Sequence, residues 1–146
     1  MKTTLTVIIT LLAVCSTAAQ DYGTAQVYTL IAVIDSDTFR ADITGWPPIV
    51  GENVRVRVRG VDSPEIRNSK CEQEKMLARK ARSFTARLLW TARTIELRAI
   101  ERDKYFRLLA DVVFDGQDLA TALAESGHGR PYMGKQKRPD WCGKVE

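Results

Sequence analysis

The chain has 146 residues, is 45% hydrophobic, and carries 22 Lys and Arg against 18 Asp and Glu, a net charge of +4. This mild basic bias excludes a protein that coats nucleic acid through charge alone, and the length fits one domain. The chain has one histidine, His128. That argues against a structural zinc site, which needs four Cys or His ligands, and against a mechanism with a histidine base.

The first 19 residues have the pattern of a signal peptide. A basic start precedes an apolar run over residues 5–14, and small residues follow up to Ala19. The run is shorter than the roughly 20 residues that span a bilayer. Cleavage after Ala18 and cleavage after Ala19 fit the pattern equally well. We therefore expect an exported domain of residues 20–146, in the periplasm or the medium, with no membrane segment after cleavage.

Two cysteines, Cys71 and Cys142, lie in the part of the chain that would be exported. In an exported protein an even pair of cysteines favours a disulfide over a metal site. Such a bond would close a loop of about 70 residues and stabilise the fold by a few kcal/mol. Two free thiols are the alternative.

Hydrophobic patterning predicts seven elements in chain order. They are strands over residues 26–34, 38–43 and 54–59, a helix over 72–91, strands over 94–100 and 108–114, and a helix over 118–126. This order predicts an α+β fold of the OB type, a five-stranded Greek-key barrel with helices. We expect the chain from His128 onward to be irregular, because it is rich in Gly, Pro and Lys.

Two of these elements show clear faces. In the third strand three valines alternate with Arg55, Arg57 and Arg59, so the valines should face the core and the arginines the opposite side. In the long helix, apolar residues recur at helical spacing and predict its buried face. These residues are Leu77, Ala81, Phe84 and Leu88.

Three segments contain groups suited to phosphodiester hydrolysis, which needs a cation on the phosphate, an activated water and stabilisation of charge on the phosphate oxygens. The segments are residues 34–38 (IDSDT), 56–65 (VRVRGVDSPE) and 103–107 (DKYFR). Taken singly, each has an ordinary structural explanation. The carboxylates can belong to a turn, Ser63-Pro64 to a helix N-terminus, the arginines to the solvated face of a sheet, and Asp103 and Arg107 to a surface ion pair.

Together and in this order, the three segments resemble the signature blocks of the staphylococcal nuclease family. The resemblance extends from about Ala25 to Gly129, nearly the whole exported domain. The middle block is the most specific, because an arginine, an aspartate and a glutamate must all fall at fixed offsets. The resemblance implies an OB-fold barrel and cleavage of DNA and/or RNA with little sequence preference. The bond to the 5′ oxygen would break and 3′-phosphates would remain.

The resemblance also implies a role for individual residues. Asp37 and Asp62 would bind Ca²⁺ through their carboxylates, and Ser63 through its backbone carbonyl. Asp35 would lie nearby without being an assured ligand. Glu65 would deprotonate or position the attacking water.

The remaining implied roles concern the nucleic acid. Arg57 and Arg107 would hold the scissile phosphate and stabilise its charge in the transition state. Tyr105 would contact the terminal phosphate or sugar, and Tyr132 is a candidate for a base-stacking aromatic. We expect the enzyme to act as a monomer.

The sequence departs from the family pattern at three places. Ser36 and Phe106 stand where the family has glycine, and the short tail ends near Cys142 without a long terminal helix. If the backbone at Ser36 has a positive φ, serine would be strained there. Two other kinds of protein remain open. One is an OB-fold module that binds single-stranded nucleic acid without cleaving it, and the other is an exported protein whose charges only aid solubility.

Overall fold

The structure, a computed structural model, describes residues 22–143. The expected signal peptide, residues 1–19, lies outside the described residues and stays a prediction. Within residues 22–143, no helix combines the length and apolar character that crossing a membrane requires.

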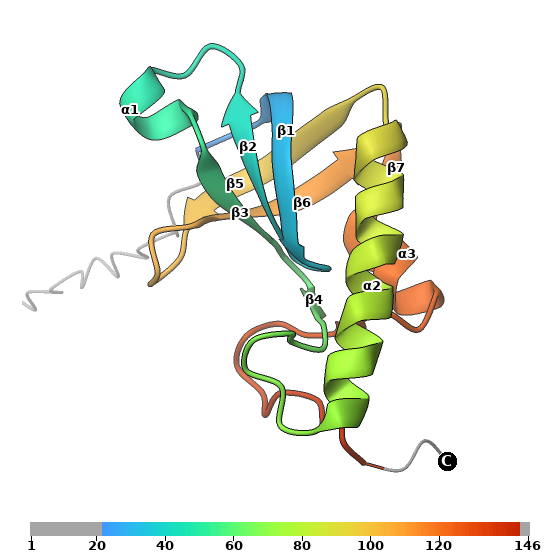
Figure 1. The fold of residues 1–146 in the computed structure, drawn as a ribbon. Coiled ribbons are helices and arrows are strands. Elements are labelled where there is room, and N and C mark those ends of the chain that lie inside the picture. Colours follow the sequence, from blue (N-terminus) through green and yellow to red (C-terminus); the bar gives the residue numbers. More distant parts are fainter. Residues whose placement is uncertain (1–21, 144–146) are drawn as a thin grey trace, which may run out of the picture.

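Five strands form a closed barrel (Figure 1). They are β1 (Ala25–Asp35), β2 (Thr38–Ile43), β3 (Val54–Val58), β5 (Ile95–Arg102) and β6 (Leu108–Phe114). Neighbouring strands pair antiparallel in the order β3-β2-β1-β5-β6, and a parallel pairing of β3 with β6 closes the ring. The expected OB-type barrel is therefore confirmed.

Every second side chain along the strands points inward and fills the barrel. Val56 and Val58 of β3 are 0% and 1% exposed, and they lie in one apolar cluster with Phe39, Leu97 and Leu108. The pairing of β1 with β2 shifts register at three places, and such irregularities bend a strand so that it can follow a barrel wall. The arginines of β3 point to the other face, as the alternation predicts.

Six shorter or peripheral elements complete the described fold. They are α1 (Pro48–Gly51), β4 (Val61–Asp62), α2 (Glu72–Thr91), β7 (Gln117–Asp118), α3 (Leu119–Glu125) and β8 (Arg130–Pro131). The long helix α2 stands beside the barrel (Figure 1). The helix is tied to the β1–β2 turn, because the Thr85 hydroxyl donates to the Ser36 carbonyl at 2.8 Å.

The buried face of α2 differs from the predicted one. Of the four predicted residues only Ala81 is fully buried, while Leu77, Phe84 and Leu88 are half-buried. The stripe is rotated because two polar residues occupy core positions, each with a partner from another segment. The fully buried residues are Glu74, Ala78, Ala81, Thr85 and Leu89.

The start of α2 is bonded to the end of the described chain. A disulfide joins Cys71 to Cys142, with the two Cα atoms 6.0 Å apart across 71 residues of sequence. The C-terminal segment, residues 129–143, also pairs with β4. Its strand β8 runs antiparallel to β4, with Arg130 opposite Asp62. These contacts hold the chain after His128 against the barrel, although most of it is irregular, as expected.

Candidate active site

The tight turn between β1 and β2 positions Asp37. Asp35 pairs with Thr38 across this turn, and the backbone N–H of Val58 donates to the Asp37 carbonyl at 2.9 Å, which fixes the turn against β3. The Asp37 side chain accepts hydrogen bonds from the hydroxyls of Thr38, at 3.0 Å, and Ser63. Asp37 is thus a buried carboxylate held by Thr38 of β2 and by Ser63, the residue after β4.

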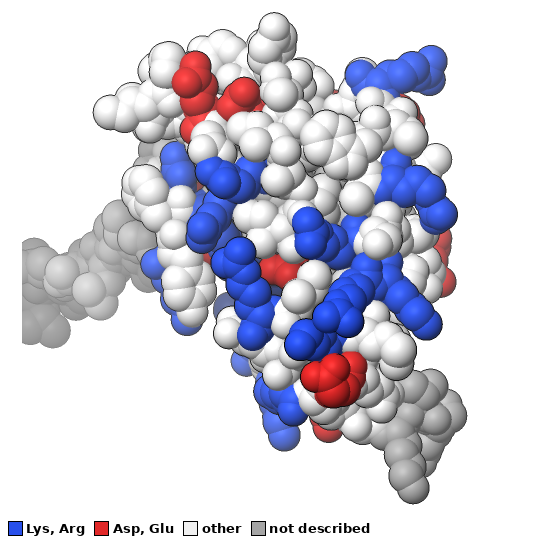
Figure 2. Space-filling model, in the orientation of Figure 1, with Lys and Arg blue, Asp and Glu red and all other residues white. Residues whose placement is uncertain are grey.

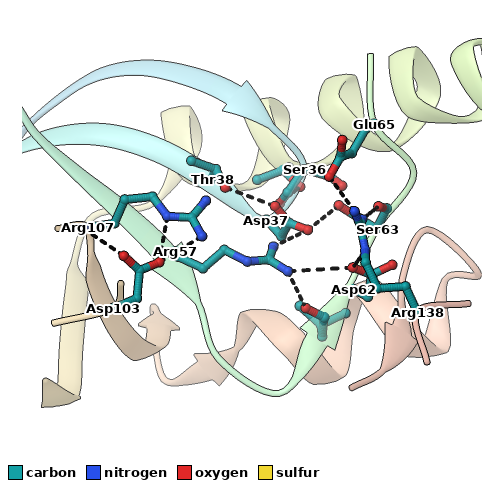
Figure 3. Close-up of polar contacts among 12 residues, drawn as sticks. Ser36, Asp37, Thr38, Arg57, Asp62, Ser63, Glu65, Asp103, Arg107 and Arg138 are labelled. Carbon is teal, nitrogen blue, oxygen red and sulfur yellow. Dashed lines mark hydrogen bonds and ion pairs between the residues drawn. The ribbon is translucent and has the colours of Figure 1, made fainter. Parts of the chain in front are cut away.

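Arg57, at the end of β3, lies between the two predicted metal-binding carboxylates (Figure 3). Its Nη1 pairs with Asp37, and its Nη2 lies 3.8 Å from Asp62 Oδ1 and donates to the Val61 carbonyl at 3.0 Å. Asp37 and Asp62 therefore face the same pocket from either side of one guanidinium group. Burial and the nearby charge of Arg107 lower the pKa of Arg57 to about 10, so Arg57 remains charged at neutral pH.

Arg107 is aimed by Asp103. The Asp103 carboxylate accepts from Arg107 Nε at 2.7 Å and from the backbone N–H groups of Tyr105 and Arg107 at 2.9 and 3.0 Å. Burial opposes ionisation of Asp103, but the hydrogen bonds from Arg107 outweigh it and lower the pKa of Asp103 below its ordinary 3.8. The exposed ring of Tyr105 lies 5.4 Å from the Arg107 guanidinium. The expected ion pair thus holds Arg107 on the Arg57 side of the pocket.

Glu65 lies on the loop between β4 and α2, and Glu74 organises that loop. No helix begins at Ser63, so its N-cap interpretation is wrong. Instead the buried carboxylate of Glu74 accepts the backbone N–H groups of Glu65 at 3.3 Å and Lys70 at 2.7 Å. The loop that carries Glu65 is therefore pinned to the first turn of α2.

A residue that we did not predict for the site, Arg138, reaches it from the C-terminal segment. Its Nε donates to Asp62 Oδ1 at 2.8 Å and its Nη1 to Glu65 Oε1 at 2.6 Å, and its Nη2 lies 3.5 Å from the Ser63 carbonyl oxygen. Although burial opposes its charge, the hydrogen bonds to Asp62 and Glu65 raise the pKa of Arg138. Trp141 adds a further contact, from its indole Nε1 to Asp62 Oδ2 at 3.3 Å.

One family model matches a large part of the chain. Residues 55–141, more than half of the chain, match the family model described as Staphylococcal nuclease homologue. The chain belongs to this family. A search of curated proteins found no match.

The departures from the staphylococcal nuclease pattern have different consequences. Ser36 is not among the residues with positive φ, so serine causes no backbone strain in the turn before Asp37. Phe106 does have a positive φ, of 64°, a conformation that glycine adopts without cost. Its ring is exposed and lies 4.5 Å from the Arg102 guanidinium. Tyr132 is anchored by its backbone N–H to the Gly60 carbonyl at 3.0 Å, next to β4, and its role toward substrate stays a prediction.

Oxygen atoms suited to a divalent cation gather in the site. Among residues 22–143 no group of three or more His, Cys, Asp or Glu side chains could hold a metal ion. The predicted calcium ligands, however, are only two carboxylates, those of Asp37 and Asp62, and the backbone carbonyl of Ser63. Cationic groups already contact these oxygens: Asp37 pairs with Arg57, and Asp62 Oδ1 and the Ser63 carbonyl oxygen contact the Arg138 guanidinium. Hard oxygen donors of this kind suit Ca²⁺, so the residues present fit the ion.

The candidate site is marked by polar contacts, not by a large cavity. A groove of about 490 Å³ lies along the outer side of α2 and contains none of the predicted site residues. The cavity beside Glu65 measures only about 30 Å³, and Arg138 and Trp141 line it. The C-terminal segment therefore covers the side of the site next to Glu65.

Proposed function

We propose that the protein is an exported, calcium-dependent nuclease that hydrolyses phosphodiester bonds in DNA and/or RNA with low sequence specificity. One observation carries the proposal. Segments far apart in the sequence bring Asp37, Arg57, Asp62 and Glu65 into one pocket, with Arg107 beside it. Membership of the staphylococcal nuclease family supports the same chemistry.

In the proposed reaction a water oxygen attacks phosphorus and the bond to the 5′ oxygen breaks, which leaves a 3′-phosphate. Asp37, Asp62 and the Ser63 carbonyl would hold Ca²⁺, which when bound offsets the charge of the phosphate and favours ionisation of water. Glu65 would take a proton from the attacking water or orient it.

Arg57 and Arg107 would bind the phosphate oxygens. Their planar guanidinium groups match two oxygens at once and remain charged at neutral pH. Both are already directed by carboxylates, Arg57 by Asp37 and Arg107 by Asp103. Asp103 is not a proposed calcium ligand, so it can keep Arg107 directed when the ion is bound, and little reorganisation of Arg107 is needed as charge builds up.

The surface around the site suits a polyanion. Lys and Arg side chains form a broad band across the face shown in Figure 2, with only small acidic areas among them. Tyr105 and Phe106 directly precede Arg107 in the chain. Both are exposed, and their rings are available for base stacking. The pattern of residues 1–19 and the Cys71–Cys142 disulfide support export to an oxidising compartment.

Digestion assays test the proposal. DNA and RNA are incubated with the protein in Ca²⁺, with and without EGTA, beside Glu65→Gln and Arg57→Ala. We expect EGTA to stop cleavage, and each substitution to slow it by about a hundredfold or more, the effect of losing a general base at Glu65 or a positioned donor at Arg57. Arg55→Ala is the matched control, because Arg55 is an exposed arginine of the same strand.

The outcomes separate the enzyme from a binding module. Cleavage that persists in EGTA, or full rate in both site variants, would contradict the proposed mechanism. Nucleic acid that binds the protein but keeps its length in Ca²⁺ would instead indicate a non-catalytic OB-fold module. Slowing by Arg55→Ala equal to that by Arg57→Ala would point to general electrostatic binding.

A further inference from the structure

Arg138 contacts oxygen atoms that the proposed function assigns to calcium and to the attacking water. Its guanidinium contacts Asp62 Oδ1 at 2.8 Å, Glu65 Oε1 at 2.6 Å and the Ser63 carbonyl oxygen at 3.5 Å. Two of these oxygens belong to proposed calcium ligands, and the third would act on the attacking water. A calcium ion and this guanidinium group need the same oxygens, so both cannot hold them at once.

The burial of Asp62 explains why a cation belongs there. Asp62 is 1% exposed, and its second oxygen accepts from Trp141 Nε1 at 3.3 Å. A buried carboxylate without a paired charge is strongly unfavourable, because burial removes its hydration. Arg57 is 3.8 Å away and is already paired with Asp37. Arg138, at 2.8 Å, is therefore the closer of the two positive charges beside Asp62 in the protein without metal.

The C-terminal segment is built to keep Arg138 in place. Cys142, four residues further on, is bonded to Cys71 at the start of α2. The Trp141 ring is buried and lies under the Arg130 guanidinium at 4.6 Å. Gly129 starts the segment so close to Val61 that a Cβ there would collide with the valine side chain. The segment is thus held at both ends beside the site.

We propose that in the metal-free protein Arg138 holds the Asp62 side of the cation site, and that Ca²⁺ must displace it from Asp62 and Glu65 to bind. This inference rests on the proposed function, because it takes Asp62 as a calcium ligand. It makes the metal affinity of the site depend on a residue of the C-terminal segment, and through that segment on the Cys71–Cys142 disulfide.

Calorimetric titration of Ca²⁺ into the metal-free protein tests the inference without measuring cleavage. If the Arg138-occupied form is favoured about ten to one, Arg138→Gln should bind Ca²⁺ about tenfold more tightly than the wild type. Lys137→Gln removes the same charge from the adjacent, exposed position. Among the described residues Lys137 has no contact with Asp62, Glu65 or Ser63, and salt screens a charge without such a contact, so we expect the affinity to change by less than about twofold.

A second measurement uses the wild-type protein, in case Arg138→Gln does not fold. The ¹⁵N NMR resonance of Arg138 Nε–H, assigned by its loss in Arg138→Lys, reports the hydrogen bond to Asp62. We expect Ca²⁺ to shift this resonance in parallel with binding, as the guanidinium group leaves the carboxylate. The double variant Cys71→Ala/Cys142→Ala should also bind Ca²⁺ more tightly than the wild type, because Arg138 is then less confined to the site.

Equal or weaker Ca²⁺ binding by Arg138→Gln, or Ca²⁺ binding that leaves the Arg138 resonance unmoved, would overturn the inference and leave the proposed nuclease intact. An equal gain in Lys137→Gln would also overturn it, since the effect would then be one of net charge. Absence of Ca²⁺ binding by every variant would overturn the inference together with the proposed calcium dependence.

Discussion

Replacing the buried Glu74 by alanine tests how the loop that carries Glu65 is held. The Glu74 carboxylate is 5% exposed and accepts two backbone N–H groups, from Lys70 at 2.7 Å and from Glu65 at 3.3 Å. In Glu74→Ala both donors lose their acceptor. A hydrogen bond to a charged group contributes about 1.5–3 kcal/mol net, and the longer contact to Glu65 should fall below that range. We therefore expect the free energy of unfolding to fall by about 2–4 kcal/mol.

Glu74→Gln is the matched control. Its amide keeps one acceptor oxygen, which can serve the shorter bond from Lys70, and replaces the other oxygen with a donor. The longer contact to Glu65 is then lost, so we expect a decrease of about 1 kcal/mol in the free energy of unfolding.

Urea denaturation followed by circular dichroism measures both variants, and cleavage in Ca²⁺ measures the effect on Glu65. The alanine variant should lose more activity than the glutamine variant, because Glu65 is no longer tied to α2. If the free energy of unfolding of Glu74→Ala lies within about 0.5 kcal/mol of the wild-type value, as for a neutral surface substitution, the loop is held by other contacts and the reasoning is wrong.

Three further predictions concern the disulfide, the positive φ of Phe106, and Asp103. Cys71→Ala/Cys142→Ala removes a cross-link spanning 71 residues and should lower the free energy of unfolding by about 4 kcal/mol; a loss below about 1 kcal/mol in urea denaturation would contradict this. Phe106→Gly should be more stable than Phe106→Ala by about 1 kcal/mol, because both lack the ring and only glycine is unstrained at positive φ; equal melting temperatures would argue against strain. The lowered pKa of Asp103 means that its ionised form stabilises the fold above pH 3.8 and that this contribution is lost as the pH falls through the folded-state pKa. Asp103→Asn should therefore be less stable than the wild type at pH 7, and the gap should narrow below pH 3.8; a gap that does not depend on pH would refute this.

The elements with strict patterns could be predicted from the sequence almost to the residue. The strand over residues 38–43, the strand over 108–114 and the helix over 72–91 begin and end where expected. In the strand over residues 38–43 polar and apolar residues alternate strictly, and the helix over 72–91 is long enough to show a helical period. The two-residue strands β4, β7 and β8 were not predicted, because two residues show no period.

The buried face of α2 could not be predicted from hydrophobicity. Glu74 and Thr85 take core positions because each bonds to backbone of another segment, the loop after β4 and the β1–β2 turn. Such partners are a property of the folded chain. A polar residue in a helix otherwise indicates the solvent-facing side.

The site shows the same limit. Residues on β-strand ends and turns, such as Asp37 and Arg57, lie in short segments whose spacing is distinctive. Arg138 lies in an irregular tail, 76 residues after Asp62, and no local pattern encodes a contact at that distance. The only signal was its closeness to Cys142, since a disulfide to Cys71 brings the tail to the start of α2.

A crystal structure of the calcium-loaded protein tests the central claim most directly, namely that one divalent cation is bound between Asp37 and Asp62. We expect a single Ca²⁺ within about 2.3–2.6 Å of both carboxylates and of the Ser63 carbonyl oxygen. The Arg138 guanidinium should then have left Asp62. Calcium bound elsewhere, or a site in which the arginines keep their present pairing with both aspartates at saturating Ca²⁺, would contradict the account.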